Sequence, residues 1–423
     1  MSSWVDAAAA KHPDRIAIED LERSLTYAQL REEAVERAGA LVGASRVAIA
    51  LPPGADFVIT LHACLLAGVV AVPIDLRLGE AERAQRLAGA EIVVTEPLRP
   101  ERTPLRVGAD RDIDLPITVM HTSGTTAAPK RVVLTGGNWL ANALGSAVAL
   151  GLDPAERWLC PMPLTHVGGL SIPIRSAIYA TTAVVQGRFE TEPVLSELMD
   201  PARRTTLVSL VPTMLARLLD AGLSRPPALR WVLLGGGPIP ATLLERAAAA
   251  GVPVAPTYGM TETCSQIATF GWPLPGAEMV VSAEAEVVVR GPMVSAGALA
   301  GDGWLRTGDL GRFDERGRLV ITGRKADTIV TGGENVAPAE VEDVLLTHPD
   351  VADAGVFARE DPEWGEAVIA SVVLRSAGGR VEADELRAFC AARLAGFKVP
   401  KAFEFVPRLP RSETGKLLRR ELG

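Results

Sequence analysis

Lysine is scarce in this chain of 423 residues. Lysine and arginine together number 43, but lysine occupies few of those positions: Lys11, Lys130, Lys325, Lys398, Lys401 and Lys416. Arginine does not replace lysine where a compact ammonium group is needed. Each lysine that the sequence retains is therefore a candidate for a specific role.

Cysteine and long apolar runs are also sparse. The four cysteines, Cys64, Cys160, Cys264 and Cys390, are far apart and form no C-x-x-C pair. This spacing predicts neither a disulfide framework nor a zinc site. The longest apolar run, near residues 63–73, is too short to span a bilayer, and no charged-then-apolar leader opens the chain. We expect a cytoplasmic protein without a membrane partner.

Basic residues do not outnumber acidic ones. The formal net charge is −8, whereas a nucleic-acid partner would require a basic face. An anionic substrate must then be held by hydrogen-bond donors in its own binding site, and not by the overall charge of the protein. The Gly-Lys-Ser/Thr signature of P-loop NTPases is missing as well.

Hydrophobic residues make up 48% of the chain, which is enough for a buried core, and the length predicts two or three domains.

Helix and strand patterns alternate through the first 250 residues or so. Strands separated by helices predict parallel sheets built from βαβ units. The clearest examples are helices at 27–41 and 56–67 and strands at 46–51 and 69–73. From Glu284 the hydrophobic period changes to two, with short runs divided by turn signals, which indicates β-hairpins.

The last hundred residues have strands and helices of their own, enough for a small α+β domain. The predicted fold class is α/β. A large N-terminal domain, residues 1–323, contains βαβ-type sheets and a β-rich subdomain. A small C-terminal domain, residues 324–423, carries Lys416.

A loop rich in threonine, serine and glycine follows an apolar run. Residues 121–130 read His-Thr-Ser-Gly-Thr-Thr-Ala-Ala-Pro-Lys. Hydroxyl groups and unhindered backbone N–H groups can form a nest for phosphate oxygens, and Lys130 adds a point charge. Such a loop by itself is more often a plain hairpin connection. The motifs further along the chain favour the phosphate site.

A second polar cluster lies at residues 258–266, Tyr-Gly-Met-Thr-Glu-Thr-Cys-Ser-Gln. An aromatic face, a hydroxyl and a carboxylate suit a nucleotide, because they can stack on the base, hydrogen-bond the α-phosphate and bind magnesium. These groups are Tyr258, Thr261 and Glu262. A buried tyrosine at a helix start beside a solvated glutamate would explain the segment equally well.

Two further signals are weak when taken alone. Asp309, in Thr-Gly-Asp, would present a carboxylate on a tight turn, where it can accept hydrogen bonds from ribose hydroxyls. An Asx turn is the simpler explanation. Lys416 follows a glycine near the C-terminus, where a lysine is ordinarily a solvated charge.

Together, in this order and at these spacings, the segments resemble the adenylate-forming superfamily of acyl-CoA synthetases, luciferases and nonribosomal-peptide adenylation domains. The resemblance covers nearly the whole chain. It implies an enzyme that makes an acyl-adenylate from a carboxylic acid and Mg-ATP and releases diphosphate. The small C-terminal domain is then mobile and swings, so that a thiol takes the acyl group. The implied partners are an acid, ATP and coenzyme A, with Mg²⁺ as cofactor, and a homo-oligomer stays possible.

The resemblance implies ATP-binding roles in four segments. The phosphate loop holds the β- and γ-phosphates with Thr122, Ser123, Gly124, Thr125, Thr126 and Lys130. Two segments enclose the adenine and α-phosphate with Gly235, Gly236, Gly237, Tyr258, Gly259, Met260 and Thr261. The ribose pair is Asp309 and Arg324. The metal ligands are Thr125, Thr126 and Glu262.

The implied catalytic residues are Lys416, Glu262, Thr261 and His166. Attack of one anion on another requires charge neutralisation at the pentavalent phosphorus, so magnesium and Lys416 act electrostatically. Two positions depart from the family pattern. Ala127 replaces a usual glycine in the phosphate loop, and Ala326 replaces an Asp or Lys at the domain hinge.

Residues around His166 resemble one branch of the superfamily. Residues 163–171 and the Cys-Ser-Gln ending of 258–266 are similar to 2-succinylbenzoate–CoA ligases of menaquinone biosynthesis. In that branch a basic residue faces the second carboxylate of the acid, and Arg175 matches it. Arginine can hold a carboxylate with two parallel hydrogen bonds. The implied substrate-binding residues are His166, Arg175, Gly236 and Ser265.

Simpler explanations exist for each of these residues. Arg175 could be a surface arginine on a helix, and His166 could pack in the acyl pocket as a neutral ring. Gly332 and Gly333 would face CoA, where glycine permits close backbone approach, or form a tight turn without a ligand.

Other functions stay open as well. A ligase for a simple aryl or fatty acid has no need of Arg175. A stand-alone adenylation domain would load a carrier protein instead of free CoA. A non-catalytic nucleotide-binding module is disfavoured, because the charged residues of the motifs are all present: Lys130, Glu262, Asp309, Arg324 and Lys416.

Overall fold

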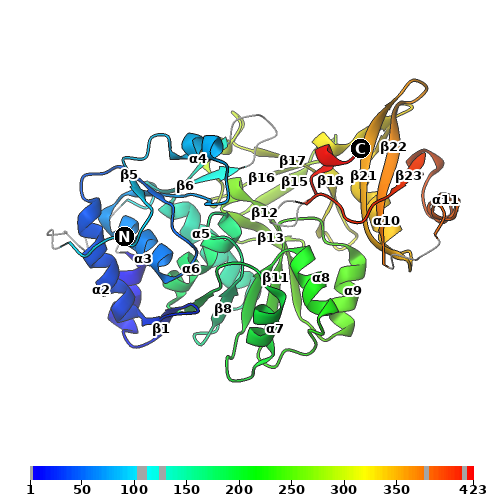
Figure 1. The fold of residues 1–423 in the computed structure, drawn as a ribbon. Coiled ribbons are helices and arrows are strands. Elements are labelled where there is room, and N and C mark those ends of the chain that lie inside the picture. The colour runs from blue at the N-terminus through cyan, green and yellow to red at the C-terminus, as the bar shows by residue number, and fades with distance from the viewer. Residues whose placement is uncertain (1–2, 102–111, 123–129, 376–380, 412–416) are drawn as a thin grey trace.

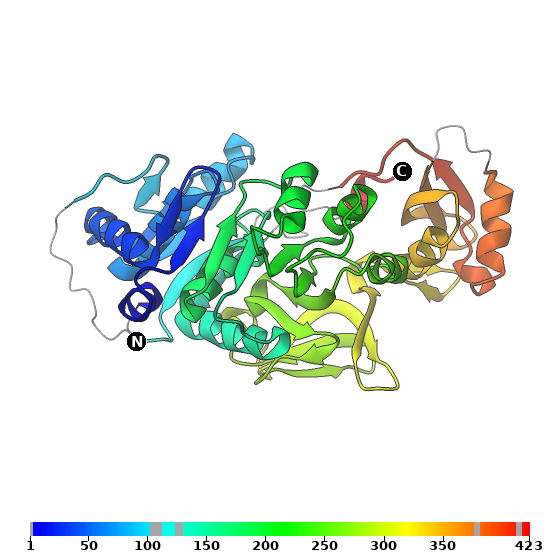
Figure 2. The same cartoon turned by 90° about the horizontal axis from the view of Figure 1, so that it is seen from below.

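The computed structural model describes residues 3–101, 112–122, 130–375, 381–411 and 417–423. Figure 1 shows an elongated molecule, in which the N-terminal sheets lie at one end and the strands and helices that follow β18 form a separate body at the other. Figure 2 shows the same separation from below. The described residues form four sheets.

The first sheet has the strand order β5-β3-β4-β6-β7. Its strands are β3 (Arg46–Ile49), β4 (Val70–Pro73), β5 (Ile92–Val94), β6 (Pro116–Thr122) and β7 (Lys130–Thr135). Its pairs are parallel except for β6 and β7, which are antiparallel. Three helices belong to this part of the chain: α2 (Tyr27–Ala38), α3 (Ala55–Ala67) and α4 (Glu80–Leu87). Thr26 caps α2 through a capping box with Gln29, as its position before the helix predicts.

The largest sheet has the order β14-β13-β12-β11-β10-β8-β9-β1-β2. Its strands are β1 (Ile16–Glu19), β2 (Ser24–Thr26), β8 (Arg157–Cys160), β9 (Thr182–Val185), β10 (Leu207–Leu210), β11 (Trp231–Leu234), β12 (Val254–Met260), β13 (Ser265–Thr269) and β14 (Trp272–Pro273). The central strands are parallel. Its helices are α1 (Trp4–Lys11), α5 (Gly136–Leu150), α6 (Val167–Tyr179), α7 (Thr191–Met199), α8 (Pro212–Asp220) and α9 (Ala241–Ala249).

A four-stranded antiparallel sheet follows, in the order β15-β16-β17-β18. Its strands are β15 (Glu278–Val281), β16 (Glu286–Arg290), β17 (Leu305–Phe313) and β18 (Leu319–Arg324). The hairpins expected from Glu284 are present, but antiparallel structure begins earlier, with the pairs β12–β13 and β13–β14 and with β15. β18 ends at Arg324, which is the predicted domain boundary.

The C-terminal body contains the fourth sheet, in which β20, β19, β22 and β21 are neighbours in that order and β23 pairs with β22. Its strands are β19 (Ile329–Thr331), β20 (Glu334–Val336), β21 (Val351–Asp361), β22 (Gly365–Leu374) and β23 (Ala402–Phe405). Helices α10 (Pro338–Leu346) and α11 (Ala383–Ala391) pack on it. Pro338 is the first residue of α10, where its missing N–H group has no consequence.

The α/β class and the α+β tail are confirmed, but one local expectation was wrong. Asp309 lies inside strand β17 and not on a tight turn between strands. The alternative explanation of Tyr258, a position at a helix start, is also excluded, because Tyr258 lies in β12. Among the described residues, every helix is too short or too polar to cross a bilayer.

Candidate active site

Three predicted nucleotide residues meet where two sheets join. Tyr258 in β12 donates a hydrogen bond of 2.8 Å from its hydroxyl to Oδ2 of Asp309 in β17. Nε of Arg324 lies 2.9 Å from Oδ1 of the same carboxylate. Asp309 and Arg324 are register partners in antiparallel β17 and β18, which explains why they meet. The structure thus brings the predicted ribose pair together beside the predicted adenine wall.

Asp309 carries the negative charge that the other two residues contact. Its side chain is buried, whereas that of Arg324 is 48% exposed at the surface. Burial, together with the charge of Asp309, raises the pKa of Tyr258 far above its usual range, so the phenol stays a neutral donor. A carboxylate can accept about four hydrogen bonds. Asp309 therefore keeps acceptor capacity for ribose hydroxyls.

The glycines Gly235–Gly237 follow β11 at the same edge of the sheet. β11 and β12 are parallel neighbours, so the residues after β11 lie beside the end of β12. A Cβ atom at Gly235 would lie 2.7 Å from Cγ2 and 2.9 Å from the carbonyl oxygen of Thr257. Gly236 has a φ of +80°, which favours glycine. Gly235–Gly237 lie next to the strand of Tyr258, and their contact with adenine stays a prediction.

A tight turn joins β12 to β13 and contains Thr261 and Glu262. A 3₁₀ helix spans Thr261–Thr263, and the following Cys264 and Ser265 have φ values of 54° and 95°. The chain returns closely on itself because residue 259 is glycine. A Cβ atom at Gly259 would lie 1.7 Å from the carbonyl oxygen of Ser265. No other residue fits at this position without moving the turn.

The two ends of the predicted phosphate loop are register partners, with Thr122 ending β6 and Lys130 beginning β7. Nζ of Lys130 lies 3.5 Å from Oε1 of Glu262. The start of β7, which ends the predicted loop, therefore meets the 258–266 segment. The loop residues Ser123, Gly124, Thr125, Thr126 and Ala127 lie outside the described residues, as does Lys416.

His166 is the N-cap residue of α6, and its side chain is exposed. Desolvation by the protein on its inner side lowers its pKa, with an opposing effect of Asp75 and a further lowering by Arg77 and Arg86. The imidazole is therefore neutral at pH 7. Asp75 pairs with Arg77 at 2.6 Å in the loop after β4. The start of α6 thus faces the first sheet.

Arg175 is buried, 1% exposed, and is not a surface residue of its helix. Its Nη2 donates to Oδ1 of Asn142 in α5, and its guanidinium carbon lies 5.4 Å from the ring centre of Trp158. Nε and Nη1 have no hydrogen-bond partner among the described residues, and no carboxylate of those residues pairs with the group. A buried cation without an anion is destabilising by several kcal/mol, on the order given for broken buried pairs. Arg175 therefore has two free donor nitrogens with which it could hold an anion.

Two family models match the chain. The AMP-binding enzyme model matches residues 5–112 and 96–299, and the AMP-binding enzyme C-terminal domain model matches residues 340–416. The chain belongs to the AMP-binding enzyme family. The predicted membership of the adenylate-forming superfamily is confirmed.

Close relatives of this AMP-binding enzyme include 2-succinylbenzoate–CoA ligase of Bacillus licheniformis, 39% identical over 99% of both chains. Among solved structures, o-succinylbenzoate CoA synthetase of Bacillus subtilis with the acyl-adenylate intermediate OSB-AMP is 36% identical. That comparison covers 100% of this chain and 98% of the other, with a TM-score of 0.91. The same synthetase with ATP and a magnesium ion is 36% identical, with a TM-score of 0.89 and coverage of 100% and 99%.

Adenylate-forming ligases use Mg²⁺, and Glu262 of this AMP-binding enzyme fits as a ligand. Mg²⁺ prefers one or two carboxylates together with phosphate oxygens. The Glu262 side chain is 16% exposed, so it retains access to solvent beside Lys130. It can therefore hold the ion from one side while ATP supplies the other ligands.

The predicted CoA residues lie in the C-terminal body. Gly332 and Gly333 form the turn between β19 and β20, with φ values of +58° and +85°. A Cβ atom at Gly332 would lie 2.8 Å from the ring of Trp364. Glycine is therefore required for the turn itself, and its contact with CoA stays a prediction.

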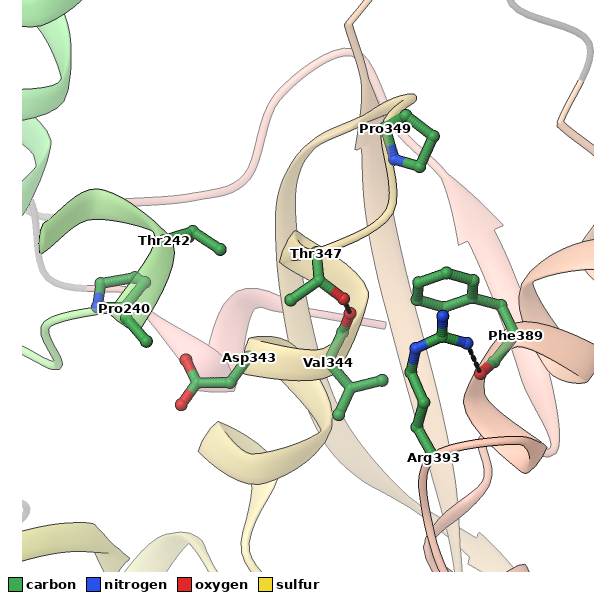
Figure 3. Close-up of a pocket in the computed structure, with 9 residues that line it drawn as sticks. Pro240, Thr242, Asp343, Val344, Thr347, Pro349, Phe389 and Arg393 are labelled. Carbon is green, nitrogen blue, oxygen red and sulfur yellow. Dashed lines mark hydrogen bonds between the residues drawn. The ribbon is translucent and has the colours of Figure 1, made fainter. Parts of the chain in front are cut away.

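A groove of about 640 Å³ lies between the two bodies of the AMP-binding enzyme (Figure 3). The start of α9 forms one side, and α10 and α11 with their flanking residues form the other. The lining residues are Pro240, Ala241, Thr242, Asp343, Val344, Thr347, Pro349, Phe389 and Arg393. None of the predicted site residues lines it, so the groove belongs to the domain interface and not to the nucleotide site.

Sequence patterns missed several residues that shape the site. Asn142 supports the turn at Thr263 and Gln266, and Asp75 lies near His166. Ser295 donates a backbone hydrogen bond of 2.8 Å to the carbonyl oxygen of Glu262. The one signal that the sequence offered was Asn142, an asparagine inside a helix. A buried amide needs specific hydrogen-bond partners, so such a residue marks a structured contact.

Proposed function

We propose that this AMP-binding enzyme is an ATP-dependent acid–CoA ligase that acts on 2-succinylbenzoate. It joins the acid and ATP to give an acyl-adenylate and diphosphate, and then transfers the acyl group to CoA with release of AMP. One observation carries the proposal. Lys130, Glu262, Tyr258, Asp309 and Arg324 converge as ATP chemistry requires, in a chain 39% identical over its length to a 2-succinylbenzoate–CoA ligase.

The nucleotide is held from three sides in this proposal. Tyr258 and Gly235–Gly237 enclose the adenine, and Asp309 with Arg324 binds the ribose. Thr261 hydrogen-bonds the α-phosphate. The phosphate loop up to Lys130 binds the β- and γ-phosphates. The described groups lie on strands and turns that the sheets position, which lowers the entropic cost of assembling the site.

Charge neutralisation is the chemical task of the adenylation step. The acid's carboxylate attacks the α-phosphorus, and both partners are anions. Glu262 would hold Mg²⁺, which would supply positive charge against the phosphate oxygens. Lys416 bridges the carboxylate and the α-phosphate, and its ammonium group stabilises the pentavalent transition state. A compact ammonium suits this contact, which agrees with the retention of lysine in an arginine-rich chain.

The domain division at residues 1–323 and 324–423 supports two half-reactions. Arg324 ends β18 and also contacts Asp309, so the nucleotide site and the start of the C-terminal domain share a residue. Rotation about the segment after Arg324 removes Lys416 and brings Gly332 and Gly333 towards the acyl-adenylate for the attack by CoA. Ala326 is part of this hinge.

The dicarboxylate is selected by Arg175. Its buried guanidinium lacks an anion among the described residues, and the second carboxylate of 2-succinylbenzoate supplies one. His166, Gly236 and Ser265 line the path of the acid. His166 acts there as a neutral ring because its pKa is lowered.

A cytoplasmic location fits the four free cysteines, all of which are buried and unbridged. The proposed substrates ATP and CoA are intracellular metabolites.

An acid panel tests the function. The enzyme is incubated with ATP, Mg²⁺ and CoA and with 2-succinylbenzoate, benzoate or medium-chain fatty acids, and diphosphate release and acyl-CoA are measured. We expect kcat/KM for 2-succinylbenzoate to exceed the others by about 100-fold, because monocarboxylates leave Arg175 unpaired. Equal rates with monocarboxylates would indicate a general acyl-CoA ligase. Diphosphate release without acyl-CoA, together with loading of a carrier protein, would indicate a stand-alone adenylation domain.

A further inference from the structure

Asn142 connects two parts of the proposed active site. It lies in α5 with no exposed surface. Its Nδ2 donates to the carbonyl oxygen of Gln266 at 2.7 Å and to that of Thr263 at 3.4 Å. Its Oδ1 accepts from Nη2 of Arg175. One side chain therefore joins the turn after β12 to the buried guanidinium.

Chemistry dictates the orientation of this amide. A guanidinium group can only donate hydrogen bonds and a carbonyl group can only accept them. The amide oxygen must therefore face Arg175, and the NH₂ group must face the turn. A flipped amide would place an NH₂ group against the guanidinium and an oxygen against two carbonyl oxygens. Burial makes each of these contacts more unfavourable than it would be in water.

The turn that Asn142 holds is strained. Cys264 and Ser265 both have positive φ values, which are unfavourable for residues with a Cβ atom and need support from the surroundings. The Thr263 hydroxyl contributes support by accepting from the Met260 N–H at 3.0 Å. Asn142 binds the carbonyl groups on both sides of the two strained residues. Removing it leaves the turn that carries Thr261 and Glu262 without its side-chain hydrogen bonds to α5.

We propose that Asn142 is a positioning residue, which holds the Thr263–Gln266 turn so that Thr261 and Glu262 meet Mg-ATP, and which ties that turn to Arg175. The proposal rests on the proposed function for the roles of Thr261 and Glu262. When the acid's second carboxylate binds Nε or Nη1 of Arg175, Nη2 stays on Asn142. Acid binding and nucleotide geometry are thereby linked through one amide.

Asn142→Asp is the variant that best tests the proposal, because it changes the hydrogen-bonding groups of the side chain with little change in its shape. The carboxylate pairs with buried Arg175, which offsets part of the cost of losing the two donated hydrogen bonds, so we expect the variant to fold. Its second oxygen faces the carbonyl groups of Thr263 and Gln266, where a donor is needed. Asn142→Ser, which removes the amide without adding charge, is the second variant. Ser146→Ala is the matched control, since Ser146 lies one turn further along the same helix and is equally buried.

The dissociation constant of Mg-ATP is measured by calorimetry on the full chain, without any acid. We expect it to rise about tenfold in Asn142→Asp and Asn142→Ser, and to change less than about twofold in Ser146→Ala. The KM for CoA should stay unchanged in all three. Wild-type affinity for Mg-ATP in folded Asn142→Asp would overturn the proposal. Wild-type protein that binds Mg-ATP but does not use 2-succinylbenzoate would refute the proposed substrate and leave the role of Asn142 standing.

Discussion

Tyr258 and Asp309 are joined by a hydrogen bond of 2.8 Å that links the largest sheet to the antiparallel one. Tyr258 comes from β12 and Asp309 from β17, and the same carboxylate holds Arg324 at the end of β18. The proposed nucleotide site therefore lies at a junction of three strands. Arg324 also precedes the segment that leads out of β18, so the proposed nucleotide site adjoins the proposed domain boundary.

Tyr258→Phe should weaken ATP binding while leaving the fold intact. The phenol is a neutral donor to a buried carboxylate, and a hydrogen bond to a charged group contributes about 1.5–3 kcal/mol. We expect the KM for ATP to rise about tenfold in a diphosphate-release assay. Tyr27→Phe is the control, since the Tyr27 hydroxyl donates to two backbone carbonyls elsewhere in the same domain. An equal rise in both variants would show that the effect is not local.

Arg175→Met should raise the KM for 2-succinylbenzoate by about 100-fold, because the second carboxylate loses a buried cation. The KM for ATP should change by less than about threefold, since Asn142 keeps its two carbonyl acceptors. Benzoylpropionate, which lacks the ring carboxylate, provides the complementary test. Wild type should bind it poorly and the variant should no longer distinguish the two acids. An unchanged KM for 2-succinylbenzoate would place Arg175 outside the acyl pocket.

Lys416→Ala should block the first half-reaction alone. Loss of a group that stabilises a developing charge lowers the rate by about 100- to 1000-fold. We expect this loss in diphosphate release, whereas the attack of CoA on supplied acyl-adenylate should continue at the wild-type rate. Lys11→Ala, at the end of α1, serves as the control lysine variant. Persistent diphosphate release in Lys416→Ala would refute the assignment.

Gly259→Ala should disrupt the turn that carries Thr261 and Glu262. The new Cβ atom would lie 1.7 Å from the carbonyl oxygen of Ser265, so the backbone must shift. A displacement of about 1 Å in a catalytic group can lower the rate about 100-fold. We expect that loss in diphosphate release. Gly297→Ala, where the added Cβ meets nothing within 4 Å, should keep full activity.

Asp343→Asn should change the pH dependence of stability. Asp343 is partly exposed at the groove, but desolvation there, with a smaller contribution from Glu342, raises its pKa from 3.8 to about 6. Because the folded value lies above the unfolded one, the ionised carboxylate destabilises the folded chain. This effect is absent below pH 3.8 and grows until the pH exceeds about 6.

Thermal unfolding at pH 8 and at pH 5 measures the effect. We expect Asp343→Asn to be more stable than wild type at pH 8, by no more than about 1 kcal/mol because solvent in the open groove screens the charge. The difference should shrink at pH 5. Asp350→Asn, an exposed aspartate of the same domain, is the control. A pH-independent difference would mean that Asp343 is not desolvated in the groove.

Regular elements were well predicted where the hydrophobic period was strong. The helix expected over 27–41 is α2 followed by a short 3₁₀ turn, and the strand expected over 69–73 is β4. The β12–β13 hairpin was not predicted, because polar motif residues interrupt its alternation. Asp309 was misplaced for a related reason: Gly308 has a positive φ inside β17 and resembles a turn signal in the sequence.

The sequence by itself determined which chemical groups the chain offers and which of them are neighbours along it. The hydroxyl of Thr261, the carboxylate of Glu262 and the glycine at position 259 follow from one short segment. Tertiary structure decided the long-range relationships, namely the contact of Tyr258 with Asp309, the burial of Arg175 and the partners of Asn142. Such contacts depend on strand order, register and the packing of helices on sheets, and local hydrophobic periodicity carries no information about which distant strands become neighbours.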